Sequence, residues 1–179
     1  PDPIGKQECY YVPFEEAVTL PCFLGKTVKT IEMKVTISPD MIQAFDMLEG
    51  FGLTRTEPIR VRGVNISPIE FLVASLTSIP IQTTQTRSYS CIAVDVVGTK
   101  GEEKVKLSLS AMTEDYDRWG VDGEGYKTAI SAAIGAEMLA RGDIKAKGVL
   151  PPEACIEPEP FIAELTKRNI RIQEKLEKL

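Results

Sequence analysis

The sequence predicts an α+β fold: a mixed, largely antiparallel sheet with helices on one face. Segments of alternating apolar and polar residues indicate strands, one pair of them is joined by a glycine turn, and helical segments interleave without a regular βαβ order. Of the 179 residues, 43% are hydrophobic and 26% are charged, as is typical of globular proteins. Because a chain of this length buries roughly 70% of its unfolded surface, we expect one folded domain over residues 1–179.

The N-terminal part favours strands followed by a helix. Residues 7–20 are rich in β-forming residues but contain Pro13, so we expect two short strands around a bend. Residues 30–37 alternate between apolar and polar side chains, which predicts a half-buried strand. Ser38 is a favourable N-cap residue and stands just before a proline, so a helix should begin there and end at Gly50.

A second strand and helix follow along the chain. Residues 59–64 predict a strand that leads into the helix. Ser67 and Glu70 have the spacing of a capping box, and Ile66 and Phe71 occupy the two positions of a hydrophobic staple. We therefore expect the helix to begin at Ser67.

The second half of the chain contains the clearest pattern. Residues 89–97 and 104–111 alternate cleanly and are joined by the turn 98–101, which predicts an antiparallel hairpin with one solvated face. An acidic, aromatic and glycine-containing loop occupies 114–125. The helix expected at 126–141 has apolar residues nearly all round, so it should be buried on most sides.

The C-terminal segment predicts one more helix and a charged tail. The helix is amphipathic and lies near residues 159–168. The tail, 171–179, has few apolar residues, so we expect it to fray or to dock elsewhere.

Composition excludes several classes of function. The chain has no histidine, so neither Ser-His-Asp nor Cys-His catalysis is available, and no site can use imidazole as a ligand or base. The net charge of −5 argues against a nucleic-acid partner. The sequence contains no G-x-G-x-x-G, P-loop or nucleophile-elbow motif, so a dinucleotide fingerprint is absent.

The cysteines and the hydropathy pattern bear on location. The four cysteines lack any C-x-x-C spacing, which favours reduced thiols in a cytoplasmic protein and no metal site. No apolar run approaches the ~18 residues of a membrane span, so we expect no membrane partner.

Charged residues at bends and strand ends are candidates for substrate binding. Glu15 and Glu16 follow Pro13 and could hold an ammonium group or simply be solvated. Arg62, within the 59–64 strand, and Arg87, before the hairpin, could bind a carboxylate, although the pattern favours a surface role for each. Trp119, the only tryptophan, is either a core residue or a pocket wall.

The junction between the acidic loop and the next helix is the strongest candidate site. Asp122, Tyr126, Lys127 and Thr128 cluster there, and a helix N-terminus offers free N–H donors to an anionic group. Asp122 and Thr128 could instead merely help to start the helix. Without histidine, proton transfer is left to Lys127, Tyr126 or a carboxylate such as Asp122.

Several segments together resemble the C-terminal part of saccharopine dehydrogenase-like proteins, a group that includes saccharopine reductases, lysine 6-dehydrogenases and carboxynorspermidine dehydrogenases. They are Y-Y-V-P-F-E-E-A-V-T-L-P at 10–21, G-L-T-R-T-E-P-I at 52–59, V-R-G-V-N-I-S-P at 61–68 and, most specifically, the run from Thr128 through G-V-L-P-P-E at 148–153. The resemblance covers nearly the whole chain.

This resemblance implies the C-terminal, substrate-binding domain of a two-domain dehydrogenase. The N-terminal Rossmann domain of the family binds NAD or NADP and would be absent from this chain, which starts at Pro1 without an initiator Met. The implied chemistry is hydride transfer at an amine-bearing carbon of an amino acid, with the domain also forming a homodimer contact. The segment 154–179 is expected to dock on the missing nucleotide-binding domain, and the chain alone should bind no cofactor.

Two positions depart from the family pattern and leave other functions open. Phe14 stands where relatives often have His before the glutamate pair, and Ser131 ends a segment where relatives have T-G-x-P. Both changes put the usual substrate in doubt. The alternatives are a standalone, non-catalytic ligand-binding or dimerisation module, and a parent enzyme that has lost turnover.

Overall fold

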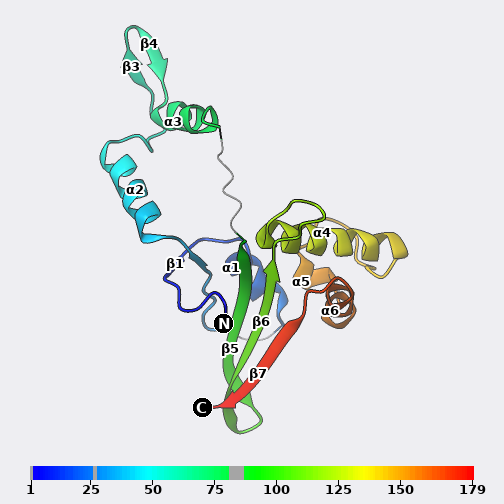
Figure 1. Cartoon of the computed structure of the whole chain (residues 1–179). Coiled ribbons are helices and arrows are strands. Elements are labelled where there is room, and N and C mark those ends of the chain that lie inside the picture. Colours follow the sequence, from blue (N-terminus) through cyan, green and yellow to red (C-terminus); the bar gives the residue numbers. More distant parts are fainter. Residues whose placement is uncertain (1, 26–27, 81–86) are drawn as a thin grey trace. The chain divides into compact units, whose positions relative to one another are not determined.

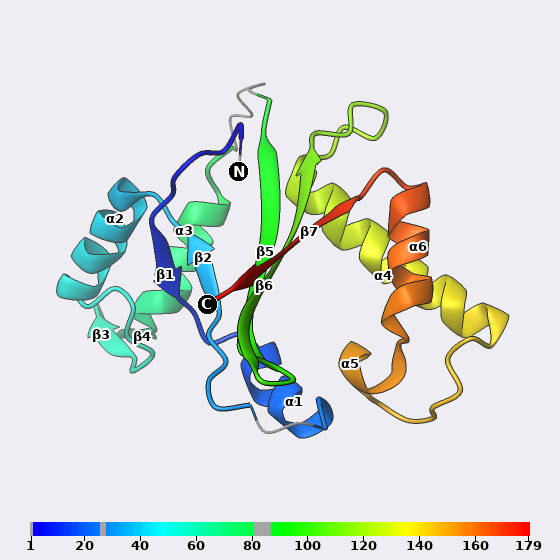
Figure 2. The same cartoon turned by 90° about the horizontal axis from the view of Figure 1, so that it is seen from below.

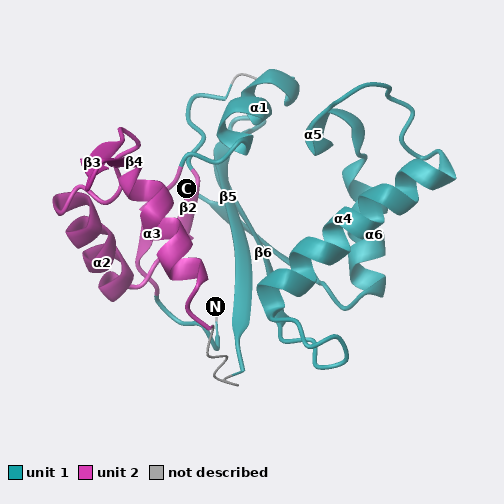
Figure 3. Ribbon diagram, turned by 90° about the horizontal axis from the view of Figure 1, so that it is seen from above, with its two compact units in different colours: residues 1–6, 13–32, 86–179 teal, residues 7–12, 33–85 magenta. Residues whose placement is uncertain are grey.

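The computed structural model describes residues 2–25, 28–80 and 87–179, and it confirms the α+β class (Figure 1). Within these ranges the strand pairs are all antiparallel, and in place of one sheet they form three small ones. The chain divides into two compact units (Figure 3). Unit 1 comprises residues 1–6, 13–32 and 86–179, and unit 2 comprises 7–12 and 33–85.

Unit 2 contains two short strand pairs and two helices. Strand β1 pairs with β2, and β3 with β4. The elements are β1 (Cys9–Tyr11), β2 (Lys34–Thr36), α2 (Pro39–Gly50), β3 (Ile59–Val61), β4 (Val64–Ile66) and α3 (Pro68–Thr77).

The helix starts in unit 2 follow the sequence in one case and depart from it in the other. The hydroxyl of Ser38 accepts a hydrogen bond from the backbone N–H of Met41 at 3.3 Å, so the predicted N-cap of α2 is confirmed. Ser67 precedes α3 but makes no side-chain cap hydrogen bond, so the predicted capping box with Glu70 is not formed.

The strand predicted at 59–64 is a hairpin, and this changes the position of Arg62. Its backbone and that of Gly63 both have positive φ, 50° and 88°, the combination that a tight two-residue hairpin turn requires. The prediction that Arg62 lies within a strand was therefore wrong, because the chain reverses direction at this residue.

Unit 1 is built on a three-stranded sheet in the order β5-β6-β7. The hairpin β5 (Tyr89–Lys100) and β6 (Glu103–Glu114) is confirmed and is longer than predicted, since Lys100 pairs with Glu103 and the turn is confined to Gly101 and Glu102. The charged tail does not fray: it forms β7 (Ile172–Lys178), which pairs with β6.

Four helices accompany this sheet, and one of them overturns a prediction. They are α1 (Glu16–Phe23), α4 (Gly123–Arg141), α5 (Pro152–Cys155) and α6 (Pro158–Lys167). Helix α1 stands where a second short strand was expected. Local bonds close its first turn, because the N–H groups of Val18 and Thr19 both reach the carbonyl of Glu15.

The core of unit 1 lies where α4, α6 and the sheet meet (Figure 2). Helix α4 buries one stripe at i, i+4 spacing, formed by Tyr126, Ile130, Ile134 and Met138. Its alanines on the other faces are exposed. The prediction that α4 is buried on most sides was wrong, because alanine adds little apolar surface and does not require a covered face.

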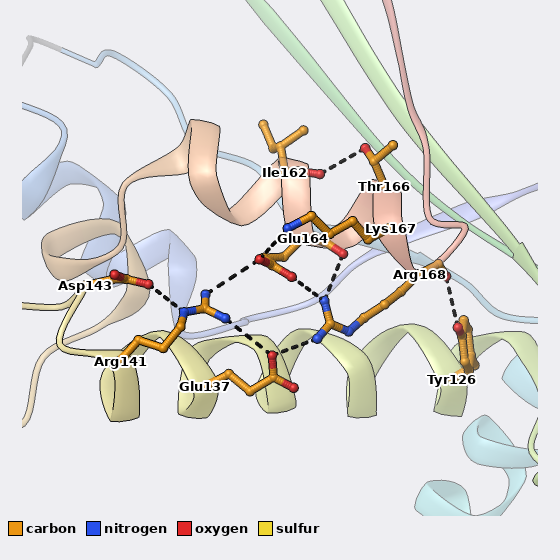
Figure 4. Close-up of polar contacts among 9 residues, drawn as sticks. All are labelled: Tyr126, Glu137, Arg141, Asp143, Ile162, Glu164, Thr166, Lys167 and Arg168. Atoms are coloured by element: carbon orange, nitrogen blue, oxygen red, sulfur yellow. Dashed lines mark hydrogen bonds and ion pairs between the residues drawn. The ribbon is translucent and has the colours of Figure 1, made fainter.

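An ion-pair network also joins α4 to α6 (Figure 4). The guanidinium of Arg168 lies 2.7 Å from Glu137 of α4 and 2.6 Å from Glu164 of α6. Arg141 contacts the same two carboxylates at 3.6 and 3.7 Å. These contacts fix the end of α6 over α4 and thereby position the segment that Tyr126 contacts.

Candidate functional site

The site forms where the end of β6 meets the start of α4. Gly123, the first residue of α4, lies against this strand: a Cβ there would be 2.7 Å from the carbonyl oxygen of Thr113. The Thr113 hydroxyl donates a hydrogen bond to the carbonyl of Gly123 at 2.7 Å. Only glycine permits this close approach, so the start of the helix is held on the strand.

Asp122 is the N-cap residue of α4, and its side chain is used in this role. Its carboxylate accepts a hydrogen bond from the N–H of Gly125 at 2.6 Å, as an N-cap residue does. The structural role that was left open for Asp122 is confirmed. Thr128 lies a turn further on, where its hydroxyl is 3.4 Å from Glu124, and it takes no part in starting the helix.

Lys127 is buried in a polar cluster between α4 and β5. Its ammonium group donates to the Ser90 hydroxyl at 2.9 Å and to the Glu124 carboxylate at 2.8 Å. The Lys127 side chain is 8% exposed, whereas that of Glu124 is 64% exposed. Hydrogen bonds from Lys127 and then from Ser90 lower the pKa of Glu124. The cluster therefore keeps a charged pair at the edge of the core.

Tyr126 is the aromatic centre of the junction. Its ring stacks on Tyr116 with centroids 4.6 Å apart, and its hydroxyl donates to the carbonyl of Arg168 at 2.9 Å. Burial, followed by the neighbouring Tyr116, raises the pKa of Tyr126 above its ordinary value of 10.0. The phenol therefore stays protonated at neutral pH and is a hydrogen-bond donor rather than a base.

Trp119 extends this aromatic group towards solvent. It meets Tyr116 edge-on at 4.9 Å between centroids and lies 5.9 Å from Tyr126. Its exposed fraction of 56% shows that it is not a core residue. It shields the aromatic pair from outside but does not itself line the pocket described next.

A pocket of about 440 Å³ opens beside the Tyr126 ring. This volume lies within the usual range of small-molecule sites. All of its walls belong to unit 1. The lining residues are Tyr89, Met112, Thr113, Glu114, Asp115, Tyr116, Tyr126 and Asn169.

Two adjacent carboxylates lie in this wall. Asp115 accepts hydrogen bonds from the backbone N–H of Ser88, at 2.9 Å, and from its hydroxyl. These bonds, the side-chain one first, lower the pKa of Asp115, so it is ionised at neutral pH. Glu114 lies 3.7 Å from the guanidinium of Arg87, and both side chains are more than half exposed.

The structure brings some predicted site residues together and leaves others apart. Arg87, Trp119, Asp122, Tyr126, Lys127 and Thr128 all lie at the β5–β6–α4 junction. Glu15 and Glu16 belong to the start of α1, which contacts α5, and neither lines the pocket. Arg62 is the exposed turn residue of a hairpin in unit 2.

Sequence reasoning missed the pocket's own lining, above all Tyr89, Met112, Glu114, Asp115 and Asn169. One signal for this wall was present in the sequence. The carboxylates Glu114 and Asp115 begin the acidic loop, directly after the clearly alternating strand segment. Asn169 could not be found in this way, because it reaches the pocket only through the packing of α6 on α4.

The described residues do not form a Rossmann-type dinucleotide site. Each strand pair among them is antiparallel, whereas a Rossmann site is built on parallel strands with a glycine-rich turn. Residues 2–25, 28–80 and 87–179 also contain no group of three or more metal-ligating side chains. The four cysteines are free thiols, of which Cys9 and Cys22 are exposed. Within these ranges no helix is both long and apolar enough to cross a bilayer.

Comparison with known proteins agrees with the resemblance noted in the sequence. The chain matches the saccharopine dehydrogenase C-terminal domain family over residues 2–170. It is also similar to the carboxyaminopropylagmatine dehydrogenase of Synechocystis sp., with 28% identity over 173 residues. That match covers 93% of this chain and 42% of the relative, so the chain spans about two fifths of the relative's length.

Proposed function

The chain belongs to the saccharopine dehydrogenase C-terminal domain family, and from this premise we propose that it is the substrate-binding and dimerisation domain of an oxidoreductase. The proposed reaction occurs at the amine-bearing carbon of an amino acid of the lysine or saccharopine type. NAD or NADP would be held by a Rossmann domain elsewhere in the protein, and the protein would act in the cytoplasm.

The observation that supports this proposal most directly is the pocket beside Tyr126. It combines carboxylates, tyrosines and a nearby guanidinium in one concave surface, which suits a ligand that carries both charge signs. The relative's name describes a dehydrogenase of an amine that also bears a carboxyl group, which is the same class of ligand.

Arg87 is the residue that we propose to bind the substrate carboxylate. It is exposed, lies at the pocket rim next to Glu114 and carries a planar fork of donors suited to a carboxylate. Trp119 does not line the pocket but would support its Tyr116 and Tyr126 wall from the loop. Thr128 would contact only a part of the substrate that extends beyond the pocket, from α4. Asp122, Tyr126 and Lys127 would contribute by positioning the helix start, since each is already engaged in a structural hydrogen bond.

Calorimetry on two forms of the protein tests this function. The chain of 179 residues is expected to bind neither NAD(H) nor NADP(H), whereas the complete protein should bind one of them. The complete protein should also reduce that dinucleotide when supplied with lysine, saccharopine, carboxynorspermidine or carboxyaminopropylagmatine. Tight dinucleotide binding by the chain alone, or no turnover of any of these amines by the complete protein, would contradict the proposal.

A further inference from the structure

The pocket wall carries an imbalance of charge. Of the eight described residues that line it, Glu114 and Asp115 are carboxylates and none is lysine or arginine. Asp115 is held ionised by Ser88, and a carboxylate that already accepts two hydrogen bonds retains lone pairs for a further donor. The pocket therefore presents negative charge to whatever enters it.

The tyrosines of the wall add to the same preference. Tyr89, Tyr116 and Tyr126 bring three aromatic rings to one pocket, and the face of such a ring attracts a cation. The phenol of Tyr126 is protonated and adds no charge to the pocket. Its O–H already donates a hydrogen bond to the carbonyl of Arg168. Apolar ring surface and two carboxylates together suit an organic cation rather than a hydrated metal ion.

Glu114 already has a cationic group beside it. Its ion-pair partner is the guanidinium of Arg87 at 3.7 Å, a long contact between two exposed side chains. Exposed pairs of this kind are weak, because water screens them and both side chains lose freedom. A ligand cation can therefore replace Arg87 on Glu114 at small cost.

We propose that this pocket binds the cationic end, ammonium or guanidinium, of an aliphatic amine, with Glu114 exchanging Arg87 for the ligand. Asp115 supplies the second negative charge and the tyrosine rings contact the aliphatic chain. Arg87, once released, is free to meet a carboxylate on the same ligand. This assignment moves ammonium recognition from Glu15 and Glu16 to Glu114 and Asp115, and it depends on the proposed function only for the statement that the ligand is the substrate.

A titration of the 179-residue chain with three probes tests the proposal. The probes are cadaverine, agmatine and 1,5-pentanediol, an uncharged analogue of cadaverine with the same chain length. Backbone amide chemical shifts would locate the binding. We expect both cations to shift the signals of Tyr89, Glu114 and Asp115 and to bind roughly tenfold or more tightly than the diol. A preference between the two cations identifies the head group.

Two variants make opposite predictions. Glu114→Gln keeps the shape of the side chain but removes its charge, and it should weaken cadaverine binding by about tenfold. Arg87→Met removes the internal competitor, and it should strengthen cadaverine binding. Glu103→Gln, at the opposite end of β6, is the matched control and should change nothing.

Several results would overturn the assignment: equal binding of diol and cadaverine, unchanged binding in Glu114→Gln, or weaker binding in Arg87→Met. These outcomes are separable from the fate of the proposed function. If the chain binds cadaverine while the complete protein oxidises no amine, the cation site stands and the dehydrogenase proposal falls. If the complete protein oxidises an amine but the chain shows no preference for a charged probe, the dehydrogenase proposal stands and the cation site falls.

Discussion

Among single residues, Lys127 combines the deepest burial of any charged group at the junction with two hydrogen-bond acceptors, Ser90 and Glu124. A buried ammonium group needs such partners because an unpaired charge in the interior is strongly unfavourable. Since Glu124 is largely exposed, it can be hydrated if the lysine is lost. Loss of the ion pair would therefore cost more for Lys127, which would be left charged and buried, than for Glu124, which water can reach.

We predict that Lys127→Met lowers the free energy of unfolding at pH 7 by about 1.5–3 kcal/mol, the range for a hydrogen bond to a charged group. The pKa of Glu124 should rise towards its ordinary 4.5, because the hydrogen bond from Lys127 that does most to lower it is removed. A carboxylate with a lowered pKa stabilises the fold above its unfolded pKa, so the difference from wild type should shrink as pH falls below 4.5.

Urea unfolding at several pH values measures this difference. Lys147→Met, at an exposed position, is the matched control and should unfold like the wild type. A Lys127→Met variant as stable as the wild type at pH 7 would show that the cluster contributes nothing to the fold and would return Lys127 to the candidates for proton transfer.

Residue chemistry alone identified this junction but not the role of each member. A role of Asp122 in starting the helix was one of two alternatives that the sequence left open, and the structure confirms it. The commitment of Tyr126 to Arg168 could not be foreseen, because the two residues are 42 positions apart and meet only after α6 has folded onto α4.

At the scale of elements, the contact between α4 and α6 depends on charge as well as on packing. Glu164 lies at its centre and is paired with Lys167 at 2.9 Å, Arg168 at 2.6 Å and Arg141 at 3.7 Å (Figure 4). Lys167, followed by Arg168, lowers the pKa of Glu164 from 4.5 to about 2. Its carboxylate therefore remains ionised over most of the acid range.

We predict that Glu164→Gln destabilises unit 1 at neutral pH. The folded-state pKa is depressed, so the contribution of Glu164 is fully present above 4.5 and is lost as pH falls towards about 2. The gap in thermal unfolding temperature between wild type and variant should therefore be constant from pH 7 to 5 and narrow from pH 4.5 to 3. Glu102→Gln, at the β5–β6 turn, serves as the control; a gap that does not change with pH would refute the ionic explanation.

Pattern reasoning succeeded for elements whose folding is local. The β5–β6 hairpin and the start of α2 follow from alternation and capping within one segment. It failed for β7, whose charged residues give no strand pattern by themselves. Leu176 meets Leu107 and Ile172 meets Ala111 across the sheet, so the strand is specified by a partner more than 60 residues earlier.

At the scale of the whole molecule, the helices of unit 1 leave one face of its three-stranded sheet partly uncovered. Register places Val94, Val96, Leu107 and Leu176 on the same face as Ala111, but only the Ala111 end lies under α4 and α6. Val96 is 52% and Leu176 is 50% exposed. This apolar surface supports the proposed dimerisation role, in which a second copy of the domain covers the face.

We predict that Val96→Glu converts the protein from dimer to monomer, because a charge would be buried in the contact. Val97→Glu is the matched control: it places the same charge on the opposite face and should leave the dimer intact. Sedimentation velocity at micromolar concentration distinguishes the species. Dimers that persist in Val96→Glu, or a wild type that is monomeric, would exclude this face as the dimer contact.

The central claim is that this domain holds the substrate while another part of the protein holds the dinucleotide. Steady-state kinetics of the complete protein with Met112→Trp tests it most directly, because Met112 lines the pocket and the larger side chain would fill it. We predict that KM for the amine substrate rises roughly tenfold or more while KM for the dinucleotide stays unchanged. An unchanged KM for the amine, or a parallel rise in both values, would contradict the account.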